Sequence, residues 1–578
     1  MGELALSVRE QSQTGDEGCH IFAGYQVWTR GDFGLNPEHP PLVKLVAAIP
    51  LLGLPLNVPS SSEASFKAEC FFGASRFLYG NDADRILFRA RLAASVFTLL
   101  LAVFVFVATQ RFFGFAPALV ALVLFCFEPN ILAHGALVTT DVAVSWGIFA
   151  SVYTFHRYAQ GPSVFRLIGC GLVVGSALVT KHSAVLIIPV LVLVCVVEIL
   201  QPREGRRKGA LRMAVGLLVI AAISVLLVWA SYGFRFQARP DSRKMSPSLA
   251  EFAPNNWHGA LILMMARWRL LPESYLYGFA DVSIVSSGRS MFLFGEVYPT
   301  GRWFYFPTAF TIKSTLAFLL LLAAVPLARG AARREALLFV APPVLVLVAV
   351  SLTFQLNIGI RHILPLYPFL IVLIAATAWN VARHQRQWRA AVVGLLLFHV
   401  ISSLRSFPDY LPYSNEIWGG PANTYKVLTD SNVDWGQGLK ATKQYLDRRG
   451  ITECWFAYFP RLVVDPAYYG IPCRPLPTFF VRFALSNKFA GLENLPGVAL
   501  VPVPSTIRGP VLVGATELSG VHWGPAELNP YRPFLKTSPL DVIAGSVLVF
   551  EGTFDVPRLA SESHAVLAGQ SAATGRSE

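Results

Sequence analysis

Charged residues are scarce in this chain. Only 14% of its 578 residues are Asp, Glu, Lys or Arg, whereas 54% are hydrophobic, and the mean hydropathy is +0.51. Soluble globular proteins carry about 25% charged residues, so this composition excludes a soluble enzyme and predicts an integral membrane protein. Much of the net charge of +13 lies in short loops between apolar stretches, where it sets membrane orientation. Nucleic acid is therefore not an expected partner.

Cysteine is also rare: seven residues are too few for a disulfide scaffold. Three cysteines lie in apolar stretches and are expected to be inert, namely Cys126, Cys170 and Cys195. The other four fall in regions predicted to lie outside the cytoplasm, where two disulfides are possible, Cys19 with Cys70 and Cys454 with Cys473.

Long apolar stretches, by contrast, are abundant. A helix needs about 20 mostly apolar residues to span a bilayer, and about ten stretches come near that length: 90–110, 115–132, 139–156, 165–180, 183–200, 213–232, 307–328, 336–354, 363–382 and 390–404. Basic residues cluster in every second loop between them, at Arg111, 157–166, 203–212, 329–334 and 383–389. By the positive-inside rule those loops are cytoplasmic, and the loops between them face outward.

The order of these stretches predicts a mainly α fold: a polytopic transmembrane helical bundle with a small extracytoplasmic α/β domain. Residues 1–88 form a first outer loop with interfacial helices, and 89–404 form the transmembrane domain with a long outer loop at 233–306. Residues 405–555 form the α/β domain, and 556–578 a disordered tail. The apolar stretch Pro41–Val58 is read as an interfacial helix, because counting it as a span would invert every later loop.

Several elements of the α/β domain can be predicted individually. Short strands are expected at Tyr425–Asp430 and Cys454–Phe459, flanking a helix at Gly436–Arg449 that Gly450 closes. Further strands are expected at Val511–Ala515 and Ser546–Glu551.

The polar motifs gather in the loops predicted to face outward. Four of them stand out: Asp16-Glu17 followed by the run from Gly31 through Pro-Glu-His-Pro-Pro to Lys44; Glu128-Pro129-Asn130 with Thr140-Asp141; Thr180-Lys181-His182-Ser183; and the run Asn357–Pro368, which includes Arg361-His362. The sequence therefore predicts that the chemistry takes place on the outer face.

This ordered set of motifs, over about residues 14–405, resembles the polyprenyl-phosphate-dependent glycosyltransferases of the membrane C-type fold. The resemblance is to the protein O-mannosyltransferase-like family, glycosyltransferase family 39, and its aminoarabinose-transferase relatives. That family has a transmembrane helix just before Asp-Glu, so the resemblance predicts an eleventh span upstream of residue 1. The run Asp430–Lys440 resembles a segment of a bacterial branch of the family, which implies the bacterial inner membrane as location and an active site that faces outward.

The resemblance implies transfer of a sugar, with mannose as a candidate, from a polyprenyl-phosphate carrier to an acceptor hydroxyl with inversion. Such a transfer needs a base for the acceptor proton and positive charge for the departing phosphate. The resemblance assigns the base to Asp16, which Glu17 and Asp141 would support. Cationic side chains suit the phosphate, so Lys181, Arg361 and Lys44 are the candidates to hold it. The expected partners are the lipid-linked sugar, membrane lipids and an acceptor that could be protein, lipid or glycan.

Each of these residues also has a plain structural reading. Asp16 and Glu17 could be solvated acids ahead of a helix, Thr140 or Asp141 could cap one, and Lys181 could pair with Asp141 or reach the headgroups. Arg361 could anchor to lipid headgroups instead of a donor. Glu38 and His39 could bind a divalent metal as a cofactor, or His39 could only fix its loop. Lys313, Arg289 and the aromatic run 303–306 could line the carrier groove or form an interfacial belt.

Two rival functions remain at this point. A transporter or flippase of a lipid-linked sugar would be expected to show internal repeats and charges within the membrane core. This chain shows no convincing repeat, and its acids lie at span ends. A non-catalytic homologue is the second rival, and it would tolerate the loss of Asp16.

Overall fold

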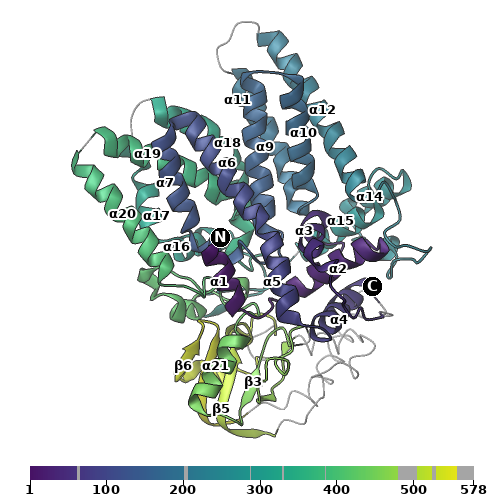
Figure 1. Ribbon diagram of the computed structural model, residues 1–578, viewed down its shortest axis with the longest axis vertical. Helices are drawn as coiled ribbons and strands as arrows, with labels where there is room; N and C mark the ends of the chain where they lie inside the picture. The colour runs from purple at the N-terminus through teal and green to yellow at the C-terminus, as the bar shows by residue number, and fades with distance from the viewer. Residues whose placement is uncertain are drawn as a thin grey trace.

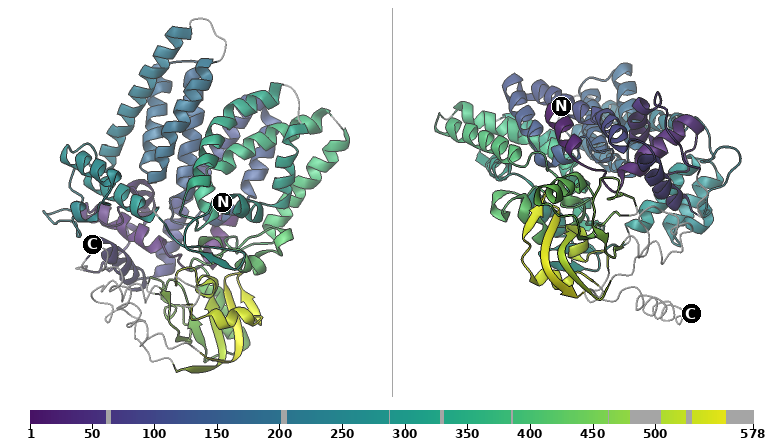
Figure 2. Two further views of the ribbon diagram at one scale, coloured as in Figure 1. Left: turned by 180° about the vertical axis from the view of Figure 1, so that it is seen from behind. Right: turned by 60° about the horizontal axis from the view of Figure 1, so that its bottom comes forward.

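A bundle of long helices stands on a small sheet domain, with the N-terminal helices between the two (Figures 1 and 2). The computed structural model describes residues 1–60, 65–200, 206–286, 288–327, 331–384, 386–461, 463–479, 504–523 and 529–555. The predicted disordered tail at 556–578 lies outside the described residues. The mainly α architecture with a small C-terminal α/β part is confirmed.

Every predicted span is helical, but only some of these helices meet the length of a bilayer. Five are long and apolar enough to cross a membrane: α5–α6 (Ala83–Ala94 and Val96–Phe113), η2–α11 (His182–Leu186 and Ile187–Leu200), α12 (Arg206–Ser231), α19 (Leu366–His384) and α20 (Arg386–Leu404). The pair α16–α17 (Tyr305–Lys313 and Leu316–Ala323), bent by 113°, makes a sixth if it is one span. By length and composition, the described residues thus give five or six spans where the sequence predicted about ten.

The remaining predicted spans are shorter or sit inside the bundle. Helices α7 (Phe115–Cys126), α10 (Val164–Leu178) and the described part of α18 (Ala331–Thr353) are apolar but short. Helix α9 (Asp141–Gln160) packs against α6, α10 and α11. Because α9 is enclosed by other helices, it can carry polar residues that a lipid-facing span would not tolerate.

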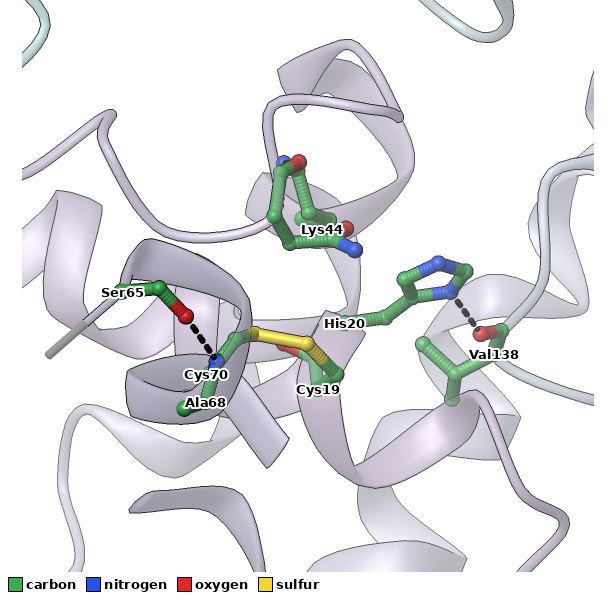
Figure 3. The surroundings of a disulfide bond; sticks show 8 residues. Cys19, His20, Lys44, Ser65, Ala68, Cys70 and Val138 are labelled. Carbon is green, nitrogen blue, oxygen red and sulfur yellow. Dashed lines mark hydrogen bonds between the residues drawn. A yellow bond between two sulfur atoms is a disulfide. The ribbon is translucent and has the colours of Figure 1, made fainter. Parts of the chain in front are cut away.

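The first outer loop is a compact helical layer. It contains α1 (Gly2–Glu10), α2 (Glu17–Arg30), α3 with η1 (Pro41–Ala48 and Ile49–Leu51) and α4 (Phe66–Tyr79). Helices α2 and α3 pack so closely that a Cβ on Gly24 would collide with the carbonyl of Lys44. Figure 3 shows the disulfide Cys19–Cys70, which joins α2 to α4. The predicted Cys454–Cys473 disulfide is present as well.

The long outer loop is also folded. It contains α13 (Leu249–Phe252), α14 (Trp257–Arg267), α15 (Glu273–Val285) and an antiparallel hairpin of β1 (Met291–Leu293) and β2 (Glu296–Tyr298). Short helical turns complete the helical part: α8 (Pro129–His134), η3 (Val325–Leu327) and η4 (Ile360–Ile363).

The C-terminal domain is built on a mixed five-stranded sheet of order β4-β3-β5-β7-β6. Its strands are β3 (Trp455–Ala457), β4 (Arg474–Pro475), β5 (Thr506–Gly514), β6 (Asp541–Ile543) and β7 (Val547–Asp555). The short helices around it are η5 (Glu416–Trp418), α21 (Leu439–Arg449), α23 (Ala515–Ser519) and η10 (Arg532–Lys536). The predicted helix and three of the predicted strands are confirmed as α21, β3, β5 and β7.

The strand predicted at Tyr425–Asp430 is wrong. The chain forms two 3₁₀ turns there, η6 (Pro421–Lys426) and η7 (Asp430–Asn432). Asp430 adopts a positive φ of 55°, which an extended strand does not allow. The turn carries the following residues back toward the helical part, where they become part of the candidate site.

Candidate active site

Four charged side chains from four separate segments meet below the helical bundle. Asp16 immediately precedes α2, Asp141 is the first residue of α9, Lys181 lies between α10 and η2, and Arg361 lies in η4. Lys181 Nζ donates to Asp141 Oδ1 at 2.6 Å, and Arg361 Nη1 lies 3.7 Å from Asp141 Oδ2 and 3.4 Å from Asp16 Oδ2. The structure therefore brings together four of the residues selected from the sequence.

Asp141 is the buried centre of this cluster. Its side chain is 1% exposed and faces two cations. A buried carboxylate is costly unless it is paired, and here Lys181 and Arg361 supply the pairing. Neither Thr140 nor Asp141 makes a side-chain capping bond to α9, so capping does not explain this carboxylate.

Asp16 is the accessible carboxylate of the cluster. Its side chain is 34% exposed, and it makes no capping hydrogen bond although it precedes the first turn of α2. Its Oδ2 accepts a hydrogen bond from Nη1 of Arg361. A carboxylate that contacts a cation and keeps a third of its side chain accessible to solvent can accept a proton from a bound hydroxyl.

Glu17, in contrast, has a structural role, because it is buried and its carboxylate oxygens accept hydrogen bonds from the protein. It is 0% exposed, and Arg91 donates to both of its oxygens at 2.9 and 2.6 Å. The backbone N–H groups of Thr14 and Val138 also donate to it. Burial acts to raise the pKa of Glu17, but the Arg91 charge and these hydrogen bonds hold the pKa below its usual value. Glu17 thus ties the loop that carries Asp16 to α5 and to the segment before α9.

The two cations of the cluster open into an apolar cavity of about 80 Å³. Lys181 and Arg361 line it together with Ser183 and His362, and the rest of its wall is mostly apolar, from Val144, Leu186, Phe306, Leu347, Val350, Phe354, Ile363, Pro365 and Leu366. Phe306 belongs to the aromatic run 303–306, for which the sequence left a carrier groove and an interfacial belt open. The cavity therefore has the positive charges of Lys181 and Arg361 next to an apolar wall.

Unsatisfied polar atoms surround the same cavity. The Nε of Arg361 and the Nε2 of His362 are buried and have no hydrogen-bond partner among the described residues. Burial also keeps the pKa of His362 well below its usual value, with Lys181 and Arg361 acting in the same direction. A buried N–H without an acceptor costs about 1–3 kcal/mol, so the Nε of Arg361 is a donor available to an oxygen atom of a ligand in this cavity.

The structure places the other predicted donor ligands elsewhere. Lys44 is 3% exposed, donates to the carbonyl of Asn36 at 2.7 Å and does not line the cavity. Burial lowers the pKa of Lys44 to about 7, opposed by the charge of Glu38. Lys313 donates to the carbonyls of Leu411 and Asn432. Both lysines therefore bind backbone carbonyls, and Lys313 is not among the residues that line this cavity.

Glu38 and His39, the candidate metal ligands, have different surroundings. The Glu38 carboxyl interacts with the charges of Lys67 and Asp281, and its burial raises its pKa. The His39 ring lies 4.6 Å from the ring of His20 and 3.3 Å from Thr140 Oγ1. Across the described ranges, no group of three or more His, Cys, Asp or Glu side chains is placed to hold a metal ion.

Sequence reasoning missed the residue on the other face of Arg361. The guanidinium carbon of Arg361 lies 4.2 Å from the ring centroid of Trp435 in a cation–π contact. Trp435 belongs to the run Asp430–Lys440, which stood out in the sequence but could not be placed near the outer loops. Its Asp-Trp-Gly-Gln-Gly composition, rich in turn formers around one tryptophan, was the available signal.

Comparison with known proteins gives one sequence match. Residues 83–229 match the family model described as dolichyl-phosphate-mannose-protein mannosyltransferase. This match confirms the resemblance predicted from the motifs, and it spans α5 to α12, including Asp141 and Lys181. No curated protein matches the chain significantly.

Solved structures of two membrane proteins are similar to the chain over most of its length. One is ArnT from Cupriavidus metallidurans bound to undecaprenyl phosphate, with 14% identity, a TM-score of 0.45, and coverage of 95% of this chain and 96% of that chain. The other is an oligosaccharyltransferase from Archaeoglobus fulgidus in complex with zinc and sulfate. It has 11% identity, a TM-score of 0.41, and coverage of 89% of this chain and 67% of that chain.

Proposed function

We propose that this chain is a membrane glycosyltransferase that takes a sugar, mannose as first candidate, from a polyprenyl-phosphate carrier and transfers it to an acceptor hydroxyl with inversion. The observation that carries the proposal is the arrangement around Arg361. Its side chain lines the apolar cavity together with Lys181, and its Nη1 reaches the accessible carboxylate of Asp16. One residue thus joins a phosphate site to a base.

The cavity has the chemistry of a lipid-phosphate site. Lys181 and the unpaired Nε of Arg361 provide donors for phosphate oxygens, and arginine is suited to bidentate contact with phosphate. The apolar lining suits the first prenyl units of a carrier. A soluble phosphate ester would need no such lining, and an uncharged lipid would not satisfy the cations.

The reaction requires one displacement at the anomeric carbon. The acceptor oxygen attacks that carbon while its proton passes to the Asp16 carboxylate. The bond from the anomeric carbon to the phosphate oxygen breaks, and its electron pair leaves with the phosphate, whose developing charge Lys181 and Arg361 hold. Attack opposite to the leaving group inverts the anomeric configuration. Asp141 takes no proton in this scheme, because its task is to keep both cations in place.

The family model supports the donor class, since its description names a dolichyl-phosphate-linked mannose. The position of the charged loops supports an outward active site. Asp141 begins α9, and Arg157, which belongs to one of the basic loops, lies in its last turn, about 24 Å away along the helix axis. The positive-inside rule then puts the site on the side away from the cytoplasm. We also propose a bacterial inner membrane as the location, which rests on the resemblance of the run Asp430–Lys440 to a bacterial branch of the family.

The decisive experiment is sugar transfer in proteoliposomes given radiolabelled polyprenyl-phosphate mannose, with free sugar from donor hydrolysis counted as well. Asp16→Asn should lower turnover by more than about 10²-fold, the scale of a lost catalytic base. Asp447→Asn is the matched control, because Asp447 is 62% exposed and pairs with Lys443 on α21. It should keep turnover within about twofold.

Other results would decide against parts of the proposal. Equal turnover of wild type and Asp16→Asn would remove Asp16 from the mechanism. Movement of intact donor across the bilayer without product would make the chain a transporter. If wild type neither transferred nor hydrolysed any sugar from a panel of polyprenyl-phosphate donors, the enzyme assignment would be wrong.

A further inference from the structure

A segment of the C-terminal domain reaches into the candidate active site. Residues 430–438, called here the 430–438 segment, run from η7 to the start of α21. Most of their side chains are buried, although the segment is a turn and not a strand or long helix. The proposed reaction uses none of its residues, so its close contacts with the site call for an explanation.

One set of contacts holds the backbone on which Arg361 lies. The Oδ1 of Asn432 accepts from the backbone N–H of Ile360 at 2.9 Å, and Asn432 Nδ2 donates to the hydroxyl of Tyr305. Ser431 Oγ donates to the carbonyl of Ile358 at 3.0 Å. A Cβ on Gly359 would collide with Ser431 Oγ, so the side chain of Ser431 packs directly against the backbone at Gly359. η4 is therefore fixed from outside by the 430–438 segment.

A second set of contacts holds the loop that ends in Asp16. The backbone N–H of Gly15 donates to the carbonyl of Trp435 at 2.8 Å, and Ser12 Oγ donates to the carbonyl of Gly436 at 2.8 Å. The Trp435 indole also lies beside Gly15, where an added Cβ would be 3.5 Å from its Nε1. Gly436 has a φ of +104°, a conformation that favours glycine and lets the chain turn between these two contacts.

Trp435 contacts both parts of the site, Arg361 and the loop that ends in Asp16. Its ring covers the guanidinium of Arg361 at 4.2 Å, and its carbonyl holds Gly15, the neighbour of Asp16. Arg361 needs such support, because its own hydrogen bond to Asp16 is long at 3.4 Å and its Nε is unpaired. A planar ring on one face leaves the guanidinium edge free for an oxygen ligand.

We propose that Trp435 is a positioning residue of the active site, which holds the guanidinium of Arg361 in the orientation that grips the donor phosphate. This inference rests on the proposed function and extends it to the C-terminal domain. The sheet domain is then a part of the catalytic unit, since its 430–438 segment fixes both the phosphate ligand and the loop of the base.

The competing explanation is that Trp435 only fills space. It does pack in an apolar cluster with α1 and α8, which includes Leu4, Leu132 and Tyr410. A packing role predicts that any loss of function follows loss of stability and is independent of Arg361. A positioning role predicts that the loss exists only while Arg361 is present.

A double-mutant cycle separates the two roles, with binding of radiolabelled undecaprenyl phosphate to the full-length protein in detergent as the readout. Trp435→Leu should weaken binding by about tenfold or more, the scale of a desolvated cation–π contact. Trp435→Phe, which keeps an aromatic face, should stay within about threefold of wild type. In the Arg361→Gln background the Trp435→Leu change should cost less than about threefold, because no guanidinium remains to be held.

Trp455→Leu is the matched control. Trp455 lies on β3, where its ring faces Arg474 with the guanidinium carbon 5.6 Å from the ring centroid. It is thus a tryptophan of the same domain with its own arginine, but it has no contact with the candidate site. It should leave binding unchanged. If Trp435→Leu is not recovered as a monodisperse protein, Trp435→Met replaces it in the same cycle.

Three results would overturn the inference: equal binding by Trp435→Leu and wild type, equal losses in the Trp435→Phe and Trp435→Leu variants, or additive losses of Trp435→Leu and Arg361→Gln. A failure of the proposed function looks different, because wild type itself would then bind no undecaprenyl phosphate and show no transfer. Transfer kinetics give a second check, in which Trp435→Leu raises the KM for the donor and leaves the KM for the acceptor within about twofold.

Discussion

The buried carboxylate of Asp141 pairs with two cations, Lys181 and Arg361. Because both cations depend on this one carboxylate, the site is sensitive to single substitutions. Lys181 and Arg361 are 14% and 11% exposed, so neither can regain full hydration if its partner is lost. Removing one member of a buried ion pair leaves an uncompensated charge. The sequence allowed capping, phosphate binding or pairing for these residues, and the structure shows pairing.

Asp141→Asn should therefore lower the free energy of unfolding by about 3–5 kcal/mol. Adding Lys181→Met should recover most of this loss, because the unpaired ammonium is gone, but it should not restore sugar transfer. Thermal unfolding in detergent and the proteoliposome assay measure the two effects. Asp84→Asn is the control: its carboxylate is 47% exposed and pairs with Lys440, so its cost should stay below about 1 kcal/mol. If Asp141→Asn and Asp84→Asn lowered the free energy of unfolding by the same amount, the pairing role of Asp141 would be wrong.

At the scale of elements, the position of Asp16 depends on how α2 is held. Helix α2 begins directly after Asp16 and is joined to α4 by Cys19–Cys70. Glu17 in its first turn binds Arg91 of α5. The second disulfide, Cys454–Cys473, ties β3 to β4 within the sheet domain. The two disulfides thus differ in whether they act on an element of the site.

The variants Cys19→Ser/Cys70→Ser and Cys454→Ser/Cys473→Ser should separate stability from activity. The sequence separations are 51 and 19 residues, so loop-closure entropy predicts losses of about 4 and about 3 kcal/mol. Sugar transfer at 20 °C below each variant's own unfolding midpoint should fall only in the first, because only that pair holds α2. The prediction fails if the two variants lose transfer equally.

At the scale of the whole molecule, the site lies where the helical bundle, the first outer loop and the sheet domain meet (Figure 1). The sheet domain contains two buried carboxyl groups of its own close to this junction. Burial raises the pKa of Asp434 to about 7, against hydrogen bonds from the N–H groups of Thr516 and Gly436. Burial likewise raises the pKa of Glu517 to about 8, against a hydrogen bond from Trp523. Their protonation therefore influences the stability of the junction.

The sign of this effect is a loss of stability with rising pH. Unfolded Asp and Glu have pKa values of about 4, so above pH 4 Asp434 and Glu517 bind more protons in the folded chain than in the unfolded one. Their contribution to stability therefore falls with rising pH until the pH passes their folded pKa values. The slope of the unfolding midpoint temperature against pH, measured from pH 4.5 to 8.5, should be less negative in Glu517→Gln than in wild type, because the variant lacks this group's share of the loss. Glu551→Gln, at an exposed position of β7, should leave the slope unchanged. A Glu517→Gln profile parallel to wild type would refute the assignment.

The amino-acid sequence by itself determined the membrane character and the helical class, and it identified both cysteine pairs that form disulfides as possible pairs. These features follow from composition, from the length of apolar stretches and from charge asymmetry, which are local properties of the chain. Local patterns also located α21 and three strands. They overestimated the number of long spans, because an enclosed helix such as α9 and a bent pair such as α16–α17 are shaped by neighbours and not by lipid alone.

Only the tertiary structure decided which polar residues meet. Asp16 and Arg361 are 345 positions apart, and no local pattern could show that Arg361 lies between Asp16 and Asp141. No local pattern could show that Lys44 donates to the carbonyl of Asn36. Nor could it show that Trp435, which lies in a different domain, contacts Arg361. The physical reason is that ion pairing and burial depend on separations in space. The sequence specifies these separations only through the packing of the entire chain.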